Sequence, residues 1–301
     1  MALIRVPCAV CGGGTFRIRY PSTILDDGTP AARYFGSSRE RAGYLSIVQC
    51  ESCGLMMTNP QDDPSTLAAI YHAHVDTAYD EERDNRRRAA RDYLAVVENY
   101  CPSKGRILDV GCGTGAFVCV AGERGWMAEG VDPAEWMIER ARAQCPTARF
   151  HIGEPWSVEL EAGSLDVVTL WNVLEHVPDP AKVLRRARMW LAPEGRLVIR
   201  VPNGQSVMAG LMGRRWVLLL REHLWYFAPK TIATLLWAQG FEVLDVRWTT
   251  IPVSVGNVLR RLAQYSGPVA ACASHLYRSG VLGGISLRFP IGEMDVVARP
   301  R

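Results

Sequence analysis

The chain has 301 residues, of which 48% are hydrophobic and 22% are charged. This composition is that of an ordinary globular protein and argues against a disordered chain, a collagen-like repeat or a coiled coil. Thirty-four basic and 31 acidic residues leave a net charge of only +3, without the concentrated basic character of nucleic-acid-binding proteins. No apolar run approaches the ~18 residues of a membrane span, and residues 1–11 lack the apolar core of a signal peptide. We therefore expect a soluble, cytoplasmic protein with one large domain and a small appendage.

Nine cysteines are present, and two Cys-x-x-Cys pairs account for four of them, Cys8, Cys11, Cys50 and Cys53. An odd count in a chain without a secretory signal favours free thiols or metal ligands over a disulfide framework. Each pair is followed by a glycine, and such a turn directs two thiolates at one place. Two turns together supply the four ligands of a structural Zn²⁺ site, with a redox pair or unrelated thiols as the alternatives. The remaining cysteines are expected to need no partner: Cys101, Cys112, Cys119, Cys145 and Cys272.

The residues around the cysteine pairs indicate a small module. Two alternating stretches, 16–20 and 44–48, are expected to form the hairpin arms of a zinc-ribbon-like module over residues 1–60. Residues 61–100 are expected to form a connector of one or two helices whose charged face is solvated.

From Gly105 onward, short apolar runs alternate with helical patterns. Such alternation predicts a parallel sheet that is covered by helices on both faces. Ligands of such sheets bind in the loops that follow the carboxyl ends of the strands, so the chemistry is expected there. The expected strands are 106–110, 127–132, 148–152, 165–171 and 196–201, and the expected helices are 116–124, 134–144 and 180–191.

The loop after the first of these strands reads Asp109-Val110-Gly111-Cys112-Gly113-Thr114-Gly115. Glycines permit positive φ and close approach of a ligand, and the helix that follows favours a carboxylate or phosphate at its amino terminus. A nicotinamide-binding protein is the competing interpretation, but the Gly-x-Gly-x-Gly spacing lacks the final gap of the dinucleotide fingerprint. Asp132 ends the next strand, where a carboxylate can accept hydrogen bonds from both hydroxyls of a ribose.

These segments resemble class I S-adenosylmethionine-dependent methyltransferases. Residues 109–115 resemble motif I of that family, and Gly130-Val131-Asp132-Pro133 resembles its second-strand acid. One branch of the family carries an amino-terminal zinc module and includes enzymes that act on sugars and natural products. That branch shares the cysteine pairs and a Glu-His-x-x-Tyr-Phe segment, which occurs here at 222–227. Three further segments resemble the family's fourth strand, the loop after it and its fifth strand: 165–168, 172–180 and 194–201.

The resemblance implies an α/β fold, a Rossmann-like seven-stranded sheet whose last strand is antiparallel, beside the zinc-ribbon-like module. The methyltransferase domain would span residues 101–301. Two long segments within it are expected to be a lid at 203–228 and a helical insertion at 250–290, with helices at 255–265 and 269–277. The remaining two strands are expected at 241–249 and 293–299.

The resemblance also implies a binding site for S-adenosylmethionine. Gly111, Gly113 and Gly115 would pass under the methionine part of the cofactor, with Asp109 fixing that loop and Asp132 holding the ribose. Three further residues are expected near the adenine, two near the methionine end and two within the motifs: Glu154, Trp156 and Leu174, then Trp171 and Asn172, and then Cys112 and Pro133.

Methyl transfer from a sulfonium is an in-line displacement, so the protein must align acceptor, methyl carbon and sulfur. A base is required where the acceptor loses a proton as it attacks. His223 lies between charged and aromatic neighbours in the expected lid and is predicted to be this base, with Glu222 or Tyr226 orienting it or the substrate. The alternatives are that His223 only anchors the lid, or that His176, which can orient the loop beside the cofactor, is the base.

Three functions follow from this sequence. The first is an enzyme that methylates an oxygen or an acidic carbon of a small molecule such as a natural product, sugar or sugar nucleotide. The second is a nucleic-acid methyltransferase whose zinc module holds RNA, and the third is a non-catalytic cofactor-binding scaffold. The near-neutral charge favours the first, so the expected partner is a small-molecule acceptor and not nucleic acid. The oligomeric state is open, with a homodimer as one option.

Overall fold

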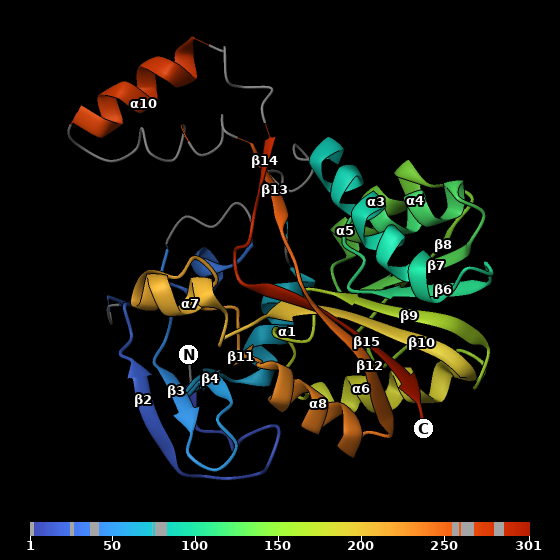
Figure 1. Ribbon diagram of the computed structural model, residues 1–301, viewed down its shortest axis with the longest axis horizontal. Coiled ribbons are helices and arrows are strands. Elements are labelled where there is room, and N and C mark those ends of the chain that lie inside the picture. The colour runs from blue at the N-terminus through green and yellow to red at the C-terminus, as the bar shows by residue number, and fades with distance from the viewer. Residues whose placement is uncertain are drawn as a thin grey trace.

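A seven-stranded sheet forms the centre of the molecule, in the order β12-β15-β10-β9-β6-β7-β8 (Figure 1). The computed structural model describes residues 3–24, 27–36, 42–73, 75, 83–254, 259, 268–279 and 286–301. Neighbouring strands are parallel except at β15, which runs antiparallel between β10 and β12. The predicted sheet with an antiparallel last strand is therefore confirmed. Its strands are β6 (Arg106–Val110), β7 (Met127–Asp132), β8 (Arg149–Ile152), β9 (Leu165–Trp171), β10 (Leu191–Pro202), β12 (Phe241–Trp248) and β15 (Glu293–Pro300).

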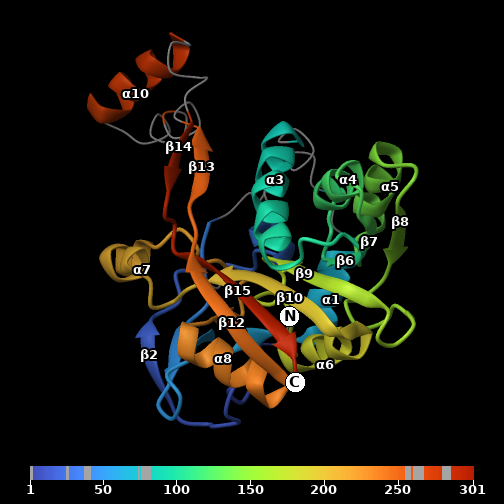
Figure 2. The same ribbon diagram turned by 45° about the vertical axis from the view of Figure 1, so that its right-hand side comes forward.

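Helices cover both faces of this sheet (Figure 2). One face carries α3 (Arg83–Tyr100), α4 (Ala116–Glu123) and α5 (Glu135–Gln144), and the other carries α6 (Pro180–Trp190) and α8 (Pro229–Ala238). Successive side chains of a strand point to opposite faces, so Val167 of β9 packs with α3 and α4 whereas Val168 packs with α6 and α8. Burial on both faces explains why these strands are continuous apolar runs in the sequence.

The amino-terminal module has a sheet of its own, in the order β11-β4-β3-β2. Its first three strands in the chain are β2 (Phe16–Tyr20), β3 (Ile47–Cys50) and β4 (Met56–Thr58), so the second hairpin arm lies a few residues later than predicted. The fourth strand, β11 (Trp225–Tyr226), comes from the segment expected to be a lid and pairs with β4. The predicted lid is therefore built into the sheet of the module.

A buried ion pair joins the same two parts of the chain. The guanidinium of Arg221 donates two hydrogen bonds to the carboxylate of Asp62, at 2.9 and 2.7 Å, and both side chains are buried. Asp62 belongs to β5 (Gln61–Asp62), which pairs with β1 (Leu3–Ile4). Thr58 adds a hydrogen bond from its hydroxyl to the carbonyl oxygen of His223, at 2.7 Å. These contacts fix residues 221–226 against the module.

The expected helical insertion at 250–290 begins and ends with strands. β13 (Ile251–Ser254) pairs antiparallel with β14 (Ser286–Phe289), and the hairpin extends away from the central sheet together with α10 (Pro268–Arg278) (Figure 1). The predicted helix at 269–277 is confirmed by α10, whereas the one at 255–265 lies outside the described residues apart from Leu259. Alternation over four residues gives too short a signal to separate such strands from the helical pattern around them.

Two of the cysteines expected to have no partner form a disulfide. Cys119 of α4 is joined to Cys145, which follows α5, with their Cα atoms 5.7 Å apart. The prediction of free thiols is wrong at these two positions, because the packing of α4 beside α5 brings together residues that are 26 positions apart. Within the described ranges, no helix has both the length and the apolar character needed to cross a lipid bilayer.

Candidate active site

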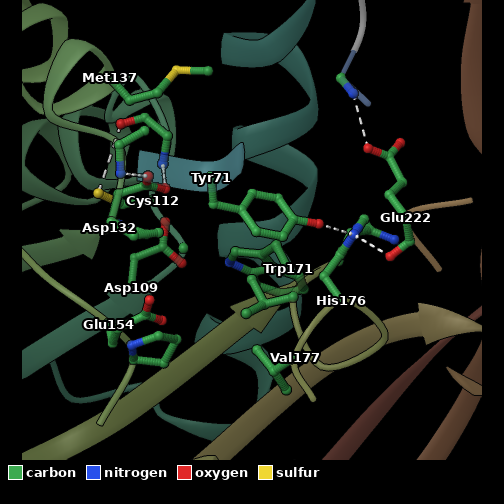
Figure 3. Close-up of a pocket in the computed structure, with 18 of the residues that line it drawn as sticks. Tyr71, Asp109, Cys112, Asp132, Met137, Glu154, Trp171, His176, Val177 and Glu222 are labelled. Atoms are coloured by element: carbon green, nitrogen blue, oxygen red, sulfur yellow. Dashed lines mark hydrogen bonds between the residues drawn. The ribbon is translucent and has the colours of Figure 1, made fainter. Parts of the chain in front are cut away.

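A cavity of about 680 Å³ lies at the carboxyl edge of β6, β7 and β9 (Figure 3). This volume is usual for a small-molecule site. Helices α1 (Pro64–His72) and α3 supply its other wall. Gly115, Leu174, His223 and Tyr226 do not line it. The predicted site residues that do line it are Asp109, Gly111, Cys112, Gly113, Asp132, Pro133, Glu154, Trp156, Trp171, Asn172, His176 and Glu222.

The glycine loop has the conformation that its sequence predicts. Gly111, Gly113 and Gly115 all have positive φ, at 72°, 52° and 79°. A Cβ atom at Gly111 would lie 2.4 Å from Cγ2 of Val173, so no larger residue fits between this loop and the loop after β9. Gly115 has a packing role, since a Cβ there would come within 2.9 Å of Cβ of Ala141 on α5.

Two carboxylates lie below this loop. Asp132 accepts hydrogen bonds from the amides of Gly113 and Ala134, both at 2.9 Å, so it ties the end of β7 to the loop after β6. Asp109 is buried, and its Oδ1 accepts a hydrogen bond from the hydroxyl of Thr169 at 2.7 Å. Burial raises the pKa of Asp109 to about 8, with the Thr169 hydrogen bond opposing the rise and the charge of Asp132 adding to it. A cation in the cavity would therefore meet a carboxyl group that gains charge readily on binding.

The far end of the cavity, beside β8, combines an aromatic ring with charged groups. The ammonium of Lys182 lies 4.3 Å from the centroid of the Trp156 ring, a cation–π contact. Glu154 lies 3.3 Å from Nε2 of His72, which joins the loop after β8 to α1. Glu154 and Trp156, the two residues expected beside the adenine, thus line the β8 end of the cavity.

The opposite end is lined by Tyr71, His176 and Glu222 (Figure 3). The Tyr71 hydroxyl lies 2.9 Å from Nδ1 of His176, and the carbonyl oxygen of Glu222 lies 3.1 Å from the same nitrogen. The Glu222 carboxylate accepts a hydrogen bond from the amide of Gly36 at 2.9 Å. Tyr71 did not stand out in the sequence because its position on α1 is that of any half-buried helix residue.

Burial shifts the pKa values of these groups in opposite directions. It raises the pKa of the Tyr71 hydroxyl well above 10, and the carboxylates of Glu222, Glu175 and Asp132 add to the rise. It lowers the pKa of His176, although the Glu222 charge and carbonyl oppose the change. The phenol therefore stays protonated near neutral pH, while the imidazole is neutral.

His223, the base expected from the sequence, lies behind His176. The two ring centroids are 4.7 Å apart, and Nδ1 of His223 donates to the carbonyl oxygen of Leu218 at 2.8 Å. Tyr226 is fully buried in the apolar cluster of the module, and its hydroxyl contacts the backbone of Leu220. Both residues support the wall of the cavity from outside it.

The four cysteines predicted as zinc ligands lie together, with their sulfur atoms within 4.8 Å of one another. Sγ of Cys8 is 3.4 Å from that of Cys53, and Sγ of Cys11 is 3.5 Å from that of Cys50. Tetrahedral Zn–S bonds of ~2.3 Å imply S–S separations of ~3.8 Å, which is close to these values. The amides of Val10 and Cys11 donate to the sulfur of Cys8. This donor set fits a closed, structural zinc site.

Comparison with known proteins agrees with this geometry. A family model described as a methyltransferase domain matches residues 79–246. Ubiquinone biosynthesis O-methyltransferase of Albidiferax ferrireducens is 34% identical over 173 residues, which are 52% of this chain and 66% of that protein. The enzyme of the same name from Neisseria meningitidis is 29% identical over 175 residues, 53% of this chain and 74% of its own length. A 37.1 kDa protein in transposon TN4556 of Streptomyces fradiae is 34% identical over 127 residues, but the match covers only 40% of this chain and 37% of that protein.

Solved structures share the fold at lower identity. A SAM-dependent methyltransferase from Archaeoglobus fulgidus has a TM-score of 0.52 at 21% identity. The match covers 74% of this chain and 100% of the Archaeoglobus chain. The 1,6-didemethyltoxoflavin-N1-methyltransferase of Burkholderia thailandensis also has a TM-score of 0.52, at 18% identity over 82% of this chain and 95% of its own. The family match covers more than half of the chain and includes the glycine loop and Asp132. The chain therefore belongs to the methyltransferase-domain family and is a class I, S-adenosylmethionine-dependent methyltransferase.

Proposed function

We propose that this enzyme transfers the methyl group of S-adenosylmethionine to a hydroxyl oxygen of a small molecule that binds at the Tyr71 end of the cavity. The observation that carries this proposal is that a single cavity joins the glycine loop and Asp132 to Tyr71, His176 and Glu222. Because the cavity is continuous, an acceptor bound at that end would face a cofactor bound at the glycine loop. The relatives named ubiquinone biosynthesis O-methyltransferases support oxygen as the methylated atom.

The cofactor is proposed to lie along the carboxyl edge of the sheet. Its methionine part would lie on Gly111 and Gly113, its ribose at Asp132 and its adenine beside Trp156. The positive φ of the glycines supports this placement, because it leaves the backbone open to close contact.

S-adenosylmethionine held by Gly111, Gly113 and Asp132 would supply the methyl group to the acceptor oxygen, with its sulfur taking the electron pair of the carbon–sulfur bond. The acceptor proton passes to the Tyr71 oxygen as the Tyr71 proton passes to Nδ1 of His176, 2.9 Å away. The raised pKa of Tyr71 means that its phenol passes the proton on without remaining ionised. The lowered pKa of His176 keeps the imidazole neutral, so that it can accept the proton. The carbonyl oxygen of Glu222 can accept a hydrogen bond from the imidazolium that results.

Removal of the imidazole tests this proposal. His176→Ala should lower kcat by ~10²-fold or more, the usual contribution of a general base, without changing the Kd of S-adenosylmethionine. His223→Ala is the matched control, since this histidine is buried outside the cavity and should affect stability more than kcat. Single-turnover transfer of labelled methyl and calorimetric cofactor binding give the two readings. A His176→Ala enzyme with unchanged kcat would refute the relay, and a protein that does not bind the cofactor would refute the whole assignment.

We also propose that Cys8, Cys11, Cys50 and Cys53 hold a structural Zn²⁺. The sulfur atoms of these four cysteines lie close together, and all four donors are thiolates. Both features support a closed tetrahedral site. Metal analysis of the purified protein should find one zinc per chain, and Cys11→Ser should lower that content. A zinc content well below one per chain would overturn the proposal.

A further inference from the structure

The floor of the cavity at the acceptor end consists of aromatic rings. Tyr93 of α3 and Trp171 at the end of β9 stack with ring centroids 4.4 Å apart and an interplanar angle of 20°. Phe117 of α4 adds a tilted contact to Trp171 at 5.5 Å. All three residues line the cavity, as do Ala89 and Ala90 of α3. Nε1 of Trp171 is buried and has no hydrogen-bond partner among the residues that the structure describes.

A buried ion pair lies against these rings. The guanidinium of Arg200 is 4.3 Å from the centroid of Tyr93 and 5.6 Å from that of Trp171. Its Nε and Nη2 donate to the two carboxylate oxygens of Asp295, at 2.6 and 2.7 Å. Both side chains are buried. The desolvation of two buried charges offsets much of their attraction, so such a pair adds little to the net stability of the fold. We therefore looked for a role of this pair in the site. Two parallel hydrogen bonds fix the guanidinium plane, and that plane in turn fixes the rings in contact with it.

We propose that Tyr93 and Trp171 form a platform for a planar aromatic acceptor and that Arg200, held by Asp295, positions this platform. The inference rests on the proposed function and names its substrate class as aromatic hydroxyl compounds. A flat ring buries its faces by stacking on other rings.

The composition of the wall favours an aromatic acceptor over a sugar. A sugar carries a hydroxyl group on nearly every carbon, and each buried hydroxyl needs a hydrogen-bond partner. Asn172 is already engaged, since its amide donates to Glu175 at 3.2 Å and to Glu293 at 2.8 Å. Beside the rings, the described wall combines four polar side chains, Tyr71, Arg86, His176 and Glu222, with small or apolar residues: Leu67, Ala68, Ala89, Ala90, Val173 and Val177.

The chain contains a matched control on its surface. Arg247 pairs with Asp245 and lies 5.2 Å from the centroid of the Tyr100 ring, the same arrangement of guanidinium, carboxylate and phenol. Its side chain is 47% exposed and does not line the cavity. A lysine keeps the charge at either position but loses the planar, two-point contact. Arg200→Lys and Arg247→Lys therefore compare the same chemical change inside and outside the site.

The first test is the substrate class. Enzyme and labelled S-adenosylmethionine are incubated with catechol and 3,4-dihydroxybenzoate in one arm and with UDP-glucose and glucose in the other. Methylation of the aromatic compounds and not of the sugars is expected. Methylation of sugars alone, or of neither class by enzyme that still binds the cofactor, would overturn the substrate class and leave the methyltransferase assignment standing. Failure to bind the cofactor would instead overturn the proposed function.

The second test is the positioning role. Arg200→Lys should raise KM for the aromatic acceptor at least tenfold, with the Kd of the cofactor unchanged within twofold, whereas Arg247→Lys should change neither. Should Arg200→Lys fail to fold, Tyr93→Phe and Tyr93→Leu give the same information, since the first keeps the ring and the second removes it. Tyr93→Phe is expected to retain acceptor binding and Tyr93→Leu to lose it. Equal KM values for Arg200→Lys and Arg247→Lys, or for the two Tyr93 variants, would overturn the proposal.

Discussion

The carboxyl group of Asp109 should make cofactor affinity depend on pH. Burial raises its pKa to about 8 in the folded protein, against 3.8 for an unperturbed aspartate. Since folding raises this pKa, the cofactor-free protein loses stability as pH rises from about 4 to about 8 and not above that range. Near pH 7 about nine in ten molecules carry a neutral Asp109, and ionising it there costs about 1.4 kcal/mol.

S-adenosylmethionine carries positive charge on its sulfur and amino group, so it should bind the ionised form of Asp109 more tightly. If only that form binds, apparent affinity follows the ionised fraction, which rises from ~0.09 at pH 7 to ~0.91 at pH 9. The expected gain is about tenfold. Asp109→Asn, which keeps the shape and cannot ionise, should lack this gain.

Isothermal titration of both proteins at pH 7, 8 and 9 measures the effect. The amino group of the cofactor also titrates, but it does so equally for both proteins, so the ratio of their Kd values isolates Asp109. Repeating the wild-type titration at pH 7 in two buffers of different ionisation enthalpy should reveal release of close to one proton. A ratio that stays constant from pH 7 to pH 9, with no proton release, would refute the reasoning.

Three further outcomes are expected. Gly111→Ala should abolish cofactor binding and lower Tm, because its Cβ has no room, whereas Gly122→Ala, with open space around it in α4, should fold and bind normally. Asp62→Asn should cost ~3–5 kcal/mol in urea unfolding, since it leaves the buried Arg221 without its charged partner; a loss below 1 kcal/mol would contradict this. The acid limb of the kcat/KM profile should lie below pH 6.5, because burial lowers the pKa of His176, and a limb above pH 7 would exclude it as the proton acceptor.

The glycine-loop end of the cavity could be predicted from sequence because its residues lie within short, local signals. The run from Asp109 to Gly115 joins a strand to a helix, and Asp132 ends the next strand, so the parallel sheet alone brings them to one edge. The periodicity of the strands predicted that sheet directly.

The Tyr71 end of the cavity could not be predicted in the same way. Tyr71, Tyr93 and Arg200 occupy two helices and a strand, and each looks in the sequence like an ordinary position of its element. Their convergence depends on how α1 and α3 pack across the sheet edge. The sequence predicts His223 in the cavity, whereas the structure places it behind His176. The course of residues 203–228 depends on a two-residue pairing between β11 and β4, which has no sequence signal.

That pairing also bears on how the chain folds. Thr58 of the module bonds to the carbonyl of His223, which is 165 residues away in the sequence, and Arg221 is 159 residues from Asp62. Contacts of this separation form late, because a long loop must close before they contribute any stability. The amino-terminal sheet therefore stays incomplete during synthesis until residues 225–226 have left the ribosome. A fragment that ends before them should expose the open edge of β4 and be prone to aggregation.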